Sequence, residues 1–497
     1  MFERIITTRL VRSIEGPNGG GLSDRQYGFR EGRSTVDAIK RVRFLSESMV
    51  EEGRVVLAIS LDIANAFNSL PHNETRRALA ELEIPCYLQR IIGDYLSGRE
   101  IVCSDRDEGR GGGMPTAASH RDRYLGRSCG TSHMTKSLGL PSPLAAQLYA
   151  TLTTRCCWPM GRNGSKRWKP RTSPSPAQCA LGLRVSAGKT EAIFLHNGTR
   201  GPPPAVAIKV EDVRVQVGAS LKYLGLHRDG TWRFEEHLHR LTPRLDGAAN
   251  ALSRLMPNLG GPRGRARRLY ANVINSIAMY GAPIWSAALA RNRKAIAVLN
   301  KTQRRMAIRA VRGYRTISHA AATLLAGMPP IQLLAKARAS VYERVVRLKD
   351  GGGVPVTARV RRLLALQLRG KVREDWRKWL EEPNRAGRRT VQAILPHLDG
   401  WIDRPWARAS YRTTQVLTGH GCFGEYLQRI RRDPTPQCQH CSEERDSAQH
   451  TLDSCPAWAA ERRALTDVIG GDLSLRAVIK AISGRSLGRR SPPSANT

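Results

Sequence analysis

Residues 57–72 read LAISLDIANAFNSLPH, and this stretch decides the fold class. It opens with a short apolar run, rich in strand formers, that Asp62 ends; a helical pattern follows through Ala78 and Leu82. The pattern predicts a buried strand with a carboxylate at its C-terminal end. Such a carboxylate can hold Mg²⁺ and organise phosphoryl transfer, or it can cap the following helix, which is the commoner role of a lone Asp at this position.

Other short strands precede a long helical region. Residues 206–217 (VAIKVEDVRVQV) alternate as a hairpin does, and residues 221–226 (LKYLGL) predict another strand. Beyond Phe234 apolar residues recur at helical spacing, as in Leu269, Val273 and Ile277. This order predicts an α+β domain followed by a mostly helical one.

The charge of the chain indicates a polyanionic partner. Its 497 residues include 80 Lys+Arg against 42 Asp+Glu, which gives a formal net charge of +38, and only 14 of the basic residues are Lys. Arginine suits phosphate forks and base stacking better than attraction to lipid, so we expect nucleic acid and no membrane partner. No stretch has the apolar length of a membrane span, and we expect a soluble, intracellular protein.

Residues 438–455 (CQHCSEERDSAQHTLDSC) have the spacing of a metal site. Two thiolates three residues apart, followed by His and Cys on a returning segment, can close a tetrahedral Zn²⁺ shell. The predicted ligands are Cys438, Cys441, His450 and Cys455, with His440 as the credible substitute. A closed Cys₃His shell has no open position, so the zinc should be structural.

Residues 182–190 (GLRVSAGKT) are close to a phosphate-binding P-loop. Gly182 and Gly188 enclose five residues where that loop has four, and a P-loop should follow the first buried strand directly. We therefore reject the NTPase interpretation. By itself, Lys189 reads as a solvated lysine in a turn.

Four segments in order carry a resemblance to a known family. Residues 21–39 (GLSDRQYGFREGRSTVDAI) are followed by LDIANAF, LRVSAGKTEAIF and LKYLGL. Together they closely resemble the reverse transcriptases of non-LTR (LINE-type) retrotransposons, especially the arthropod elements that insert into repeated genes. The resemblance covers roughly residues 1–102 and 181–460.

The resemblance implies a role for each matching residue. Asp62 would be the first Mg²⁺-binding carboxylate of the palm, Phe67 the aromatic gate under the incoming sugar, and Lys189 a cation that assists the leaving pyrophosphate. Tyr223, Leu224 and Gly225 match the primer-grip turn. The residues that match the fingers segment gripping template and nucleotide are Gln26, Gly28, Phe29, Arg30, Arg33 and Ser34.

The resemblance also implies a right-hand polymerase, with fingers and palm followed by a helical thumb and a zinc knuckle. The expected partners are an RNA template, a DNA primer and deoxynucleotides, in the nucleus, with Mg²⁺ as cofactor if the chain is active. The chain would begin inside the fingers, so we assign it no endonuclease. The expected parts are 1–102 (partial fingers and first part of the palm), 103–180 (out of frame), 181–232 (remaining palm and primer grip), 233–330 (thumb), 331–432 (helical basic region), 433–460 (zinc knuckle) and 461–497 (helix and disordered tail).

Two motifs of the family are missing. The palm needs a Tyr-Ala-Asp-Asp turn and a Pro-Gln-Gly-Ser loop; neither string exists here, and residues 123–190 contain no Asp or Glu. Reading the gene from the third base of each codon permits the first motif at residues 149–159 and the second at residues 119–136. We interpret this as a frame displacement, and expect residues 103–180 to form no palm strands and to be disordered. The chain would then be an inactive polymerase or, alternatively, a non-catalytic nucleic-acid-binding remnant.

The region before the zinc motif adds a further expectation. It is basic and carries Trp376, Trp379, Trp401 and Trp406, which could stack on bases while arginines contact the backbone. For any one of these tryptophans, packing in a core is the commoner role.

Overall fold

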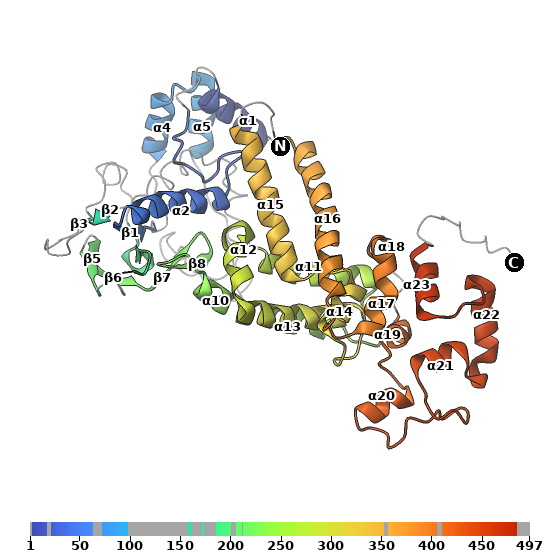
Figure 1. Ribbon diagram of the computed structural model, residues 1–497. Coiled ribbons are helices and arrows are strands. Elements are labelled where there is room, and N and C mark those ends of the chain that lie inside the picture. Colours follow the sequence, from blue (N-terminus) through green and yellow to red (C-terminus); the bar gives the residue numbers. More distant parts are fainter. Residues whose placement is uncertain are drawn as a thin grey trace, which may run out of the picture. The chain divides into compact units, whose positions relative to one another are not determined.

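The computed structural model divides the chain into two compact units, Met1–Thr231 and Trp232–Thr497 (Figure 1). The division lies next to the expected boundary between residues 232 and 233. The described strands all lie in the first unit, whereas helices occur in both units. The chain is therefore a mixed and mostly helical protein, in agreement with the α+β expectation. The structure describes residues 2–16, 21–62, 72–97, 158–160, 171–172, 185–199, 205–210, 212–351, 356–404 and 410–484.

A six-stranded sheet organises the first unit around β1 (Val55–Ser60), the strand expected from the apolar run. β1 pairs antiparallel with β4 (Glu191–Leu195), with Ser60 opposite Glu191. Alternate side chains of β1 pack in two separate apolar clusters, Leu57 with Ile59 in one and Val56 with Ala58 in the other. Because both faces are covered, the strand reads as a continuous apolar run.

The predicted hairpin is confirmed, and the strand predicted after it is corrected. β5 (Ala207–Val210) and β6 (Val213–Gly218) pair antiparallel, as the alternation indicates. Residues 221–226 are not one strand but the centre of a second hairpin, formed by β7 (Ser220–Tyr223) and β8 (Leu226–Asp229). A turn therefore interrupts LKYLGL where we expected a straight strand.

The segment 103–180 contributes two short strands. β2 (Trp158–Met160) pairs antiparallel with β1, and β3 (Arg171–Thr172) pairs parallel with β5, so that the sheet order is β2-β1-β4-β6-β5-β3. We expected no palm strands in this segment; these two short stretches do pair with β1 and β5, and backbone pairing at a sheet edge requires no apolar pattern. The rest of the segment lies outside the described residues.

Four α-helices and one short 3-10 helix, η1 (Ala187–Lys189), accompany the described strands of the first unit. α1 packs Ile6, Leu10 and Ile14 against an apolar cluster that includes Leu88 and Ile92 of α5. α2 contacts β1 and begins at Ser34, whose hydroxyl accepts a hydrogen bond from the backbone N–H of Asp37 (3.3 Å). The helices are α1 (Phe2–Glu15), α2 (Thr35–Glu51), α4 (His72–Glu81) and α5 (Cys86–Leu96).

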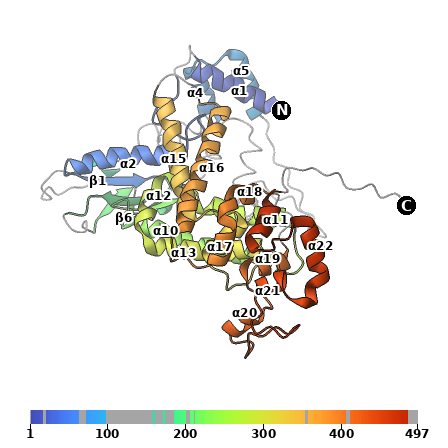
Figure 2. The same cartoon turned by 45° about the vertical axis from the view of Figure 1, so that its right-hand side comes forward.

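The described part of the second unit contains helices and no strand. The long helices α15 and α16 lie side by side in both views (Figure 2). The bounds are α10 (Glu235–Arg254), α11 (Gly264–Ala278), α12 (Ala282–Arg291), α13 (Arg293–Ala310), α14 (His319–Ala326), α15 (Ile331–Asp350), α16 (Ala358–Glu381), α17 (Arg388–Ile394), η2 (Leu395–His397), α18 (Leu398–Asp403), α19 (Tyr411–Thr418), α20 (Gly424–Arg429), α21 (Ala448–Asp453), η4 (Pro456–Trp458), α22 (Ala459–Ile469) and α23 (Leu475–Gly484).

Helix α11 is present as predicted, but its buried face differs from the apolar stripe in the sequence. Leu269 and Val273 are 62% and 41% exposed, whereas Ala271 and Ile274 are buried. Arg267 is also fully buried on this helix. Because a charged residue occupies a core position, the buried face of α11 shows no continuous apolar pattern in the sequence. The apolar stripe through Leu269 and Val273 therefore predicted the wrong buried face.

Arg267 is satisfied by backbone carbonyls. Its Nε donates to the carbonyl oxygen of Pro262 (2.9 Å) and its Nη1 to that of Arg309 (2.7 Å). Its Nη2 donates to the carbonyls of Gly260 (3.1 Å) and Pro257. The guanidinium thus ties the α10–α11 connection to the end of α13.

None of the described helices is by itself long and apolar enough to cross a membrane. Helices α11 and α12 meet the length and composition requirement only as a pair, bent by 84°.

Candidate functional site

The sheet brings Asp62 and Lys189 together. Asp62 follows β1, and Lys189 ends η1 (Ala187–Lys189) just before β4, so the antiparallel pairing of these strands places both residues at one edge. The backbone N–H of Ser186 donates to the carbonyl oxygen of Asp62 (2.7 Å), which fixes the approach. The Lys189 Nζ lies 3.6 Å from the Asp62 Oδ2, with 71% of the lysine side chain and 30% of the aspartate side chain exposed.

These residues do not complete the two-metal site that the family resemblance implies. Two Mg²⁺ ions need carboxylates on both sides of the pair, and Asp62 supplies one carboxylate, already beside a cation. Among the described residues, one group of three or more His, Cys, Asp or Glu residues could hold a metal ion. That group lies in the second unit and does not include Asp62. The predicted gate Phe67 lies outside the described residues.

Glu191 is a site residue that the sequence reasoning missed. Its Oε2 accepts a hydrogen bond from the backbone N–H of Lys222 (2.6 Å), which links β4 to β7. Glu191 comes two residues after Lys189, so this bond connects the Asp62 edge to the β7–β8 hairpin. An acid at the start of the apolar strand EAIFL was the available signal.

The predicted primer-grip residues form the turn between β7 and β8. Leu224 and Gly225 have φ values of 47° and 84°, the left-handed pair that a two-residue hairpin turn of type I′ requires. Glycine adopts this conformation without strain, whereas Leu224 is held in it by the pairing of Tyr223 with Leu226. The three predicted residues therefore lie at the tip of a regular two-residue hairpin.

The predicted fingers residues form a compact turn before α2. Gln26 is buried, and its Nε2 donates to the carbonyl oxygen of Gly28 (3.3 Å). Phe29 has φ 54° and is 58% exposed, so a large apolar ring projects from a left-handed position. Ser34 caps α2 and also donates from its hydroxyl to the Asp37 carboxylate (2.7 Å).

The two fingers arginines have intramolecular partners. Arg30 pairs with Glu15 (3.2 Å) and donates to the carbonyl oxygen of Ser23 (3.0 Å). Arg33 pairs with Asp24 (3.2 Å) and lies 5.4 Å from the centre of the Tyr27 ring. Both guanidinium groups are thus held in place at the surface of the turn.

The four predicted metal ligands converge. One ligand atom from each of Cys438, Cys441, His450 and Cys455 lies within 4.8 Å of all the others. The Sγ atoms of Cys438 and Cys455 are 4.0 Å apart, and the Cys441 Sγ is 3.3 Å from the His450 Nε2. Tetrahedral bonds of ordinary Zn–S and Zn–N length would separate such pairs by roughly 3.6 to 3.8 Å. The residues therefore fit a four-coordinate metal ion.

Local hydrogen bonds position these ligands. Ser447 caps α21 and accepts from the backbone N–H of His450 (3.0 Å), while Cys455 donates its N–H to the His450 carbonyl (3.0 Å). Arg462 donates to the carbonyl oxygen of Cys455. Burial raises the pKa of the Cys438 thiol to about 11, so without a cation Cys438 is a thiol and not a thiolate.

Two of the four tryptophans are core residues and do not offer a stacking face. Trp376 and Trp401 are almost fully buried, and the Trp401 indole N–H donates to the carbonyl oxygen of Leu324 (3.0 Å). Trp379 is covered by the guanidinium of Arg385, 3.5 Å from the ring centre. Trp406 lies outside the described residues. For Trp376 and Trp401 the commoner role, packing in a core, is therefore confirmed, and base stacking by these two side chains is wrong.

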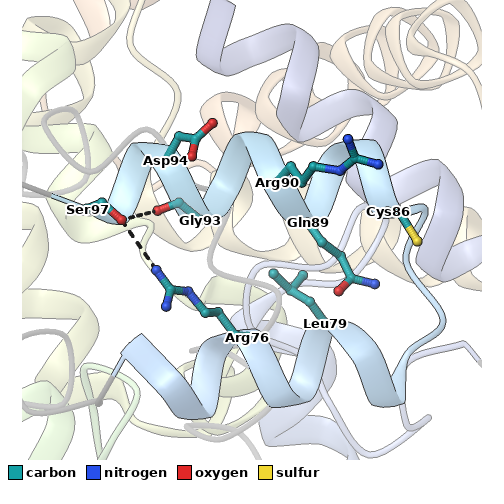
Figure 3. A pocket seen from close by; sticks show the side chains of 8 residues that line it. All are labelled: Arg76, Leu79, Cys86, Gln89, Arg90, Gly93, Asp94 and Ser97. Atoms are coloured by element: carbon teal, nitrogen blue, oxygen red, sulfur yellow. Dashed lines mark hydrogen bonds between the residues drawn. The ribbon is translucent and has the colours of Figure 1, made fainter.

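A pocket of about 380 Å³ lies between α4 and α5 (Figure 3). Figure 3 shows Arg76 reaching from α4 toward the end of α5, where its Nη2 donates to the Ser97 hydroxyl (3.3 Å). Arg90 and Asp94 both line this pocket, so its charge is mixed. It offers no defined site for an anion.

Curated relatives of the chain are retrotransposon proteins. A retrovirus-related Pol polyprotein from the type-1 retrotransposable element R1 4 of Nasonia vitripennis is 28% identical over 314 residues, 59% of this chain and 79% of the relative. A putative 115 kDa protein in the type-1 retrotransposable element R1DM of Drosophila melanogaster is 24% identical over 447 residues, 87% of this chain and 42% of the relative. The chain's curated homologues are arthropod non-LTR retrotransposon proteins.

Other non-LTR relatives extend this result. A probable RNA-directed DNA polymerase from transposon BS of Drosophila melanogaster is 25% identical over 314 residues, 60% of this chain and 34% of the relative. The chain thus spans less than half the length of the two Drosophila relatives. No family model matches the chain, and no solved structure matches it.

Proposed function

We propose that this chain is an RNA-directed DNA polymerase by descent, and that it now binds an RNA template and a DNA primer without extending the primer. The single observation that carries the descent is the pairing of Asp62 with Lys189 at the edge of the sheet. Two residues assigned from separate motifs meet there, which supports the roles of palm carboxylate and assisting cation proposed for them. The names of the homologues support the same reaction class.

The proposed loss of activity follows from the missing metal-binding carboxylates. Two Mg²⁺ ions about 4 Å apart repel each other and need negative ligands between and around them. The sequence has no Tyr-Ala-Asp-Asp string and no acid between residues 123 and 190. We infer that the frame displacement removed these ligands, and we assign no catalytic step to the chain as its sequence stands.

The remaining function is nucleic-acid binding in the nucleus. The net charge of +38 supplies the attraction to phosphate, and the fingers turn and the β7–β8 tip supply defined surfaces in the first unit. In the second unit, we propose that Cys438, Cys441, His450 and Cys455 hold one structural Zn²⁺. The metal would stabilise the segment that contains α21, because a closed shell has no position for substrate.

One preparation of the full chain tests both parts of this proposal. Fluorescence anisotropy with a labelled primer–template measures the affinity over a series of salt concentrations, and a gel of the same mixture with Mg²⁺ and deoxynucleotides measures extension. We expect binding that weakens steeply with salt and no added nucleotides. Affinity that does not change with salt would refute the binding part, and extension would refute the inactive part.

A further inference from the structure

A second cavity, of about 340 Å³, lies within the second unit. Its walls come from the segment before α14, the start of α17, the end of α19 and α20. The lining residues include no Asp or Glu but two arginines, Arg389 and Arg429. The cavity is therefore positively charged, unlike the pocket between α4 and α5.

Arg389 lines this cavity and has few hydrogen-bond partners within the protein. Its Nε is buried and has no hydrogen-bond acceptor among the described residues, and its Nη2 makes only one long contact, 3.5 Å, to the carbonyl oxygen of Val416. Burial lowers the pKa of Arg389, yet arginine stays charged at neutral pH. A partly buried guanidinium in a cavity lined by no acid favours an anionic ligand there.

The wall beside Arg389 is built to stay open. Gly419 has φ 67°, and a Cβ there would lie 3.3 Å from the Arg389 Cδ. A Cβ on Gly387 would overlap the Ser318 Oγ, whose hydroxyl donates to the carbonyl oxygen of Ala386 (2.9 Å). A side chain at Gly419 or Gly387 would therefore crowd Arg389 or the Ser318 cap of α14.

The other polar groups that line the cavity are neutral, so the two arginines supply its charge. The His420 ring stacks on Tyr426 with centres 4.8 Å apart, and the Thr316 hydroxyl contacts both the His420 Nδ1 (3.0 Å) and the Tyr426 hydroxyl (2.7 Å). Burial and the nearby Arg429 lower the pKa of His420 to about 4, so this ring is neutral at physiological pH. The exposed Arg429 lies over the Tyr426 ring, with its guanidinium carbon 5.2 Å from the ring centre.

The acid that acts electrostatically on Arg389 is paired with another arginine. Glu425 is the carboxylate whose charge reaches Arg389, but it pairs with Arg445 (3.0 Å) and does not line the cavity. Arg389 therefore lacks a counter-charge inside the cavity.

We propose that this cavity binds one phosphate group of a nucleic-acid strand between the guanidinium groups of the partly buried Arg389 and the exposed Arg429. Guanidinium groups bind phosphate through parallel N–H bonds, and the volume leaves room for the attached sugar. This inference rests on the proposed function, because the chain's charge and its homologues favour a nucleic-acid strand over an acidic or phosphorylated peptide. It adds an anchoring point in the second unit.

The test uses the full chain and a labelled single-stranded RNA 12-mer. Arg389→Gln and Arg429→Gln each remove one charge, and Ala386→Trp fills the cavity from an exposed position without changing the charge. Arg347→Gln, on the exposed side of α15, is the charge-matched control. We expect the first three to weaken binding about fivefold or more, the two arginine variants to lower the salt slope by about one, and the control to stay within about twofold.

Each other outcome has a defined meaning. If Ala386→Trp and Arg429→Gln both bind like the control, the cavity is not a phosphate site; these two exposed changes settle this even if Arg389→Gln unfolds. If inorganic phosphate or AMP displaces the strand as well as unlabelled RNA does, or if only a phosphopeptide competes, the ligand class is wrong. If the unaltered chain binds no RNA at all, the proposed function fails and this inference fails with it.

Discussion

The Nζ of Lys189 lies 3.6 Å from the Oδ2 of Asp62, although the two residues are far apart in the sequence. The antiparallel pairing of β1 with β4 brings them together, and the Ser186 N–H bond to Asp62 holds η1 against the strand end. Both side chains are partly exposed, so the arrangement suits a functional contact better than a stabilising one.

The first prediction is that this ion pair adds little to stability. Asp62→Ala and Lys189→Met should each lower the free energy of unfolding by less than about 1 kcal/mol, because exposed ion pairs are screened by water. Leu57→Ala on the buried part of β1 is the contrast and should cost about 2 to 5 kcal/mol. Chemical denaturation measures all three; a loss above 2 kcal/mol for Asp62→Ala would show a structural role.

The second prediction concerns the metal centre. The full chain should contain one Zn²⁺, and Cys441→Ser should lose it, because three ligands cannot close the shell. Cys422→Ser is the matched control, since Cys422 is exposed and is not a ligand in this cluster. Elemental analysis after dialysis gives the stoichiometry. Zinc retained in Cys441→Ser, or lost in Cys422→Ser, would contradict the ligand assignment.

The third prediction concerns Arg267. Arg267→Met should lower the free energy of unfolding by about 3 kcal/mol or more, because four backbone carbonyls lose a buried donor. Burial, with Arg312 and Arg309 nearby, lowers the pKa of Arg267 to about 10, so the group is still charged at neutral pH. Arg265→Met on the same helix is exposed and should change stability little. Equal effects of the two changes would refute this role.

The fourth prediction is a pH dependence that comes from His319. Burial first, then Arg385 and Arg304, lower its pKa to about 4, and its Nε2 lies 3.1 Å from the Gln303 Oε1. The folded pKa is below the unfolded value, so the neutral ring stabilises the fold above pH 6.5 and this contribution is lost as the pH falls toward 4. Between pH 7.5 and pH 5 the loss should be about 2 kcal/mol.

The His319 effect is isolated by comparing variants. His319→Gln should lose less stability over this pH range than the unaltered chain, and His239→Gln, at an exposed position on α10, should behave like the unaltered chain. Denaturation midpoints at the two pH values give the comparison. The same pH dependence in all three proteins would assign the effect to other groups.

Parts of the fold follow from local patterns. The continuous apolar run predicts β1 because both of its faces are covered, and the alternation at residues 206–217 predicts β5 and β6. The turn inside LKYLGL escaped prediction because Leu224 occupies a left-handed position that normally takes Gly or Asn. The true buried face of α11 escaped it because Arg267, and not an apolar residue, fills the core.

The site was only partly accessible from sequence. The four residues that converge as possible metal ligands follow from spacing alone, and the family resemblance selected Asp62 and Lys189. The bond from Glu191 to the Lys222 N–H depends on the relative placement of two strands, which no local pattern encodes. The cavity at Arg389 depends on helices distant in sequence, so charge counting alone could not place it.

The measurement that tests the central claim most directly is primer extension by two forms of the chain. One is the chain as its sequence stands, and the other has residues from about 104 to 180 replaced by the displaced-frame translation, which restores the Tyr-Ala-Asp-Asp turn. Each is assayed with and without Asp62→Ala, on the same RNA template and DNA primer with Mg²⁺. We expect no extension by the first form, extension by the restored form, and loss of that extension on Asp62→Ala. Template-dependent synthesis by the unaltered chain that disappears on Asp62→Ala would contradict the account.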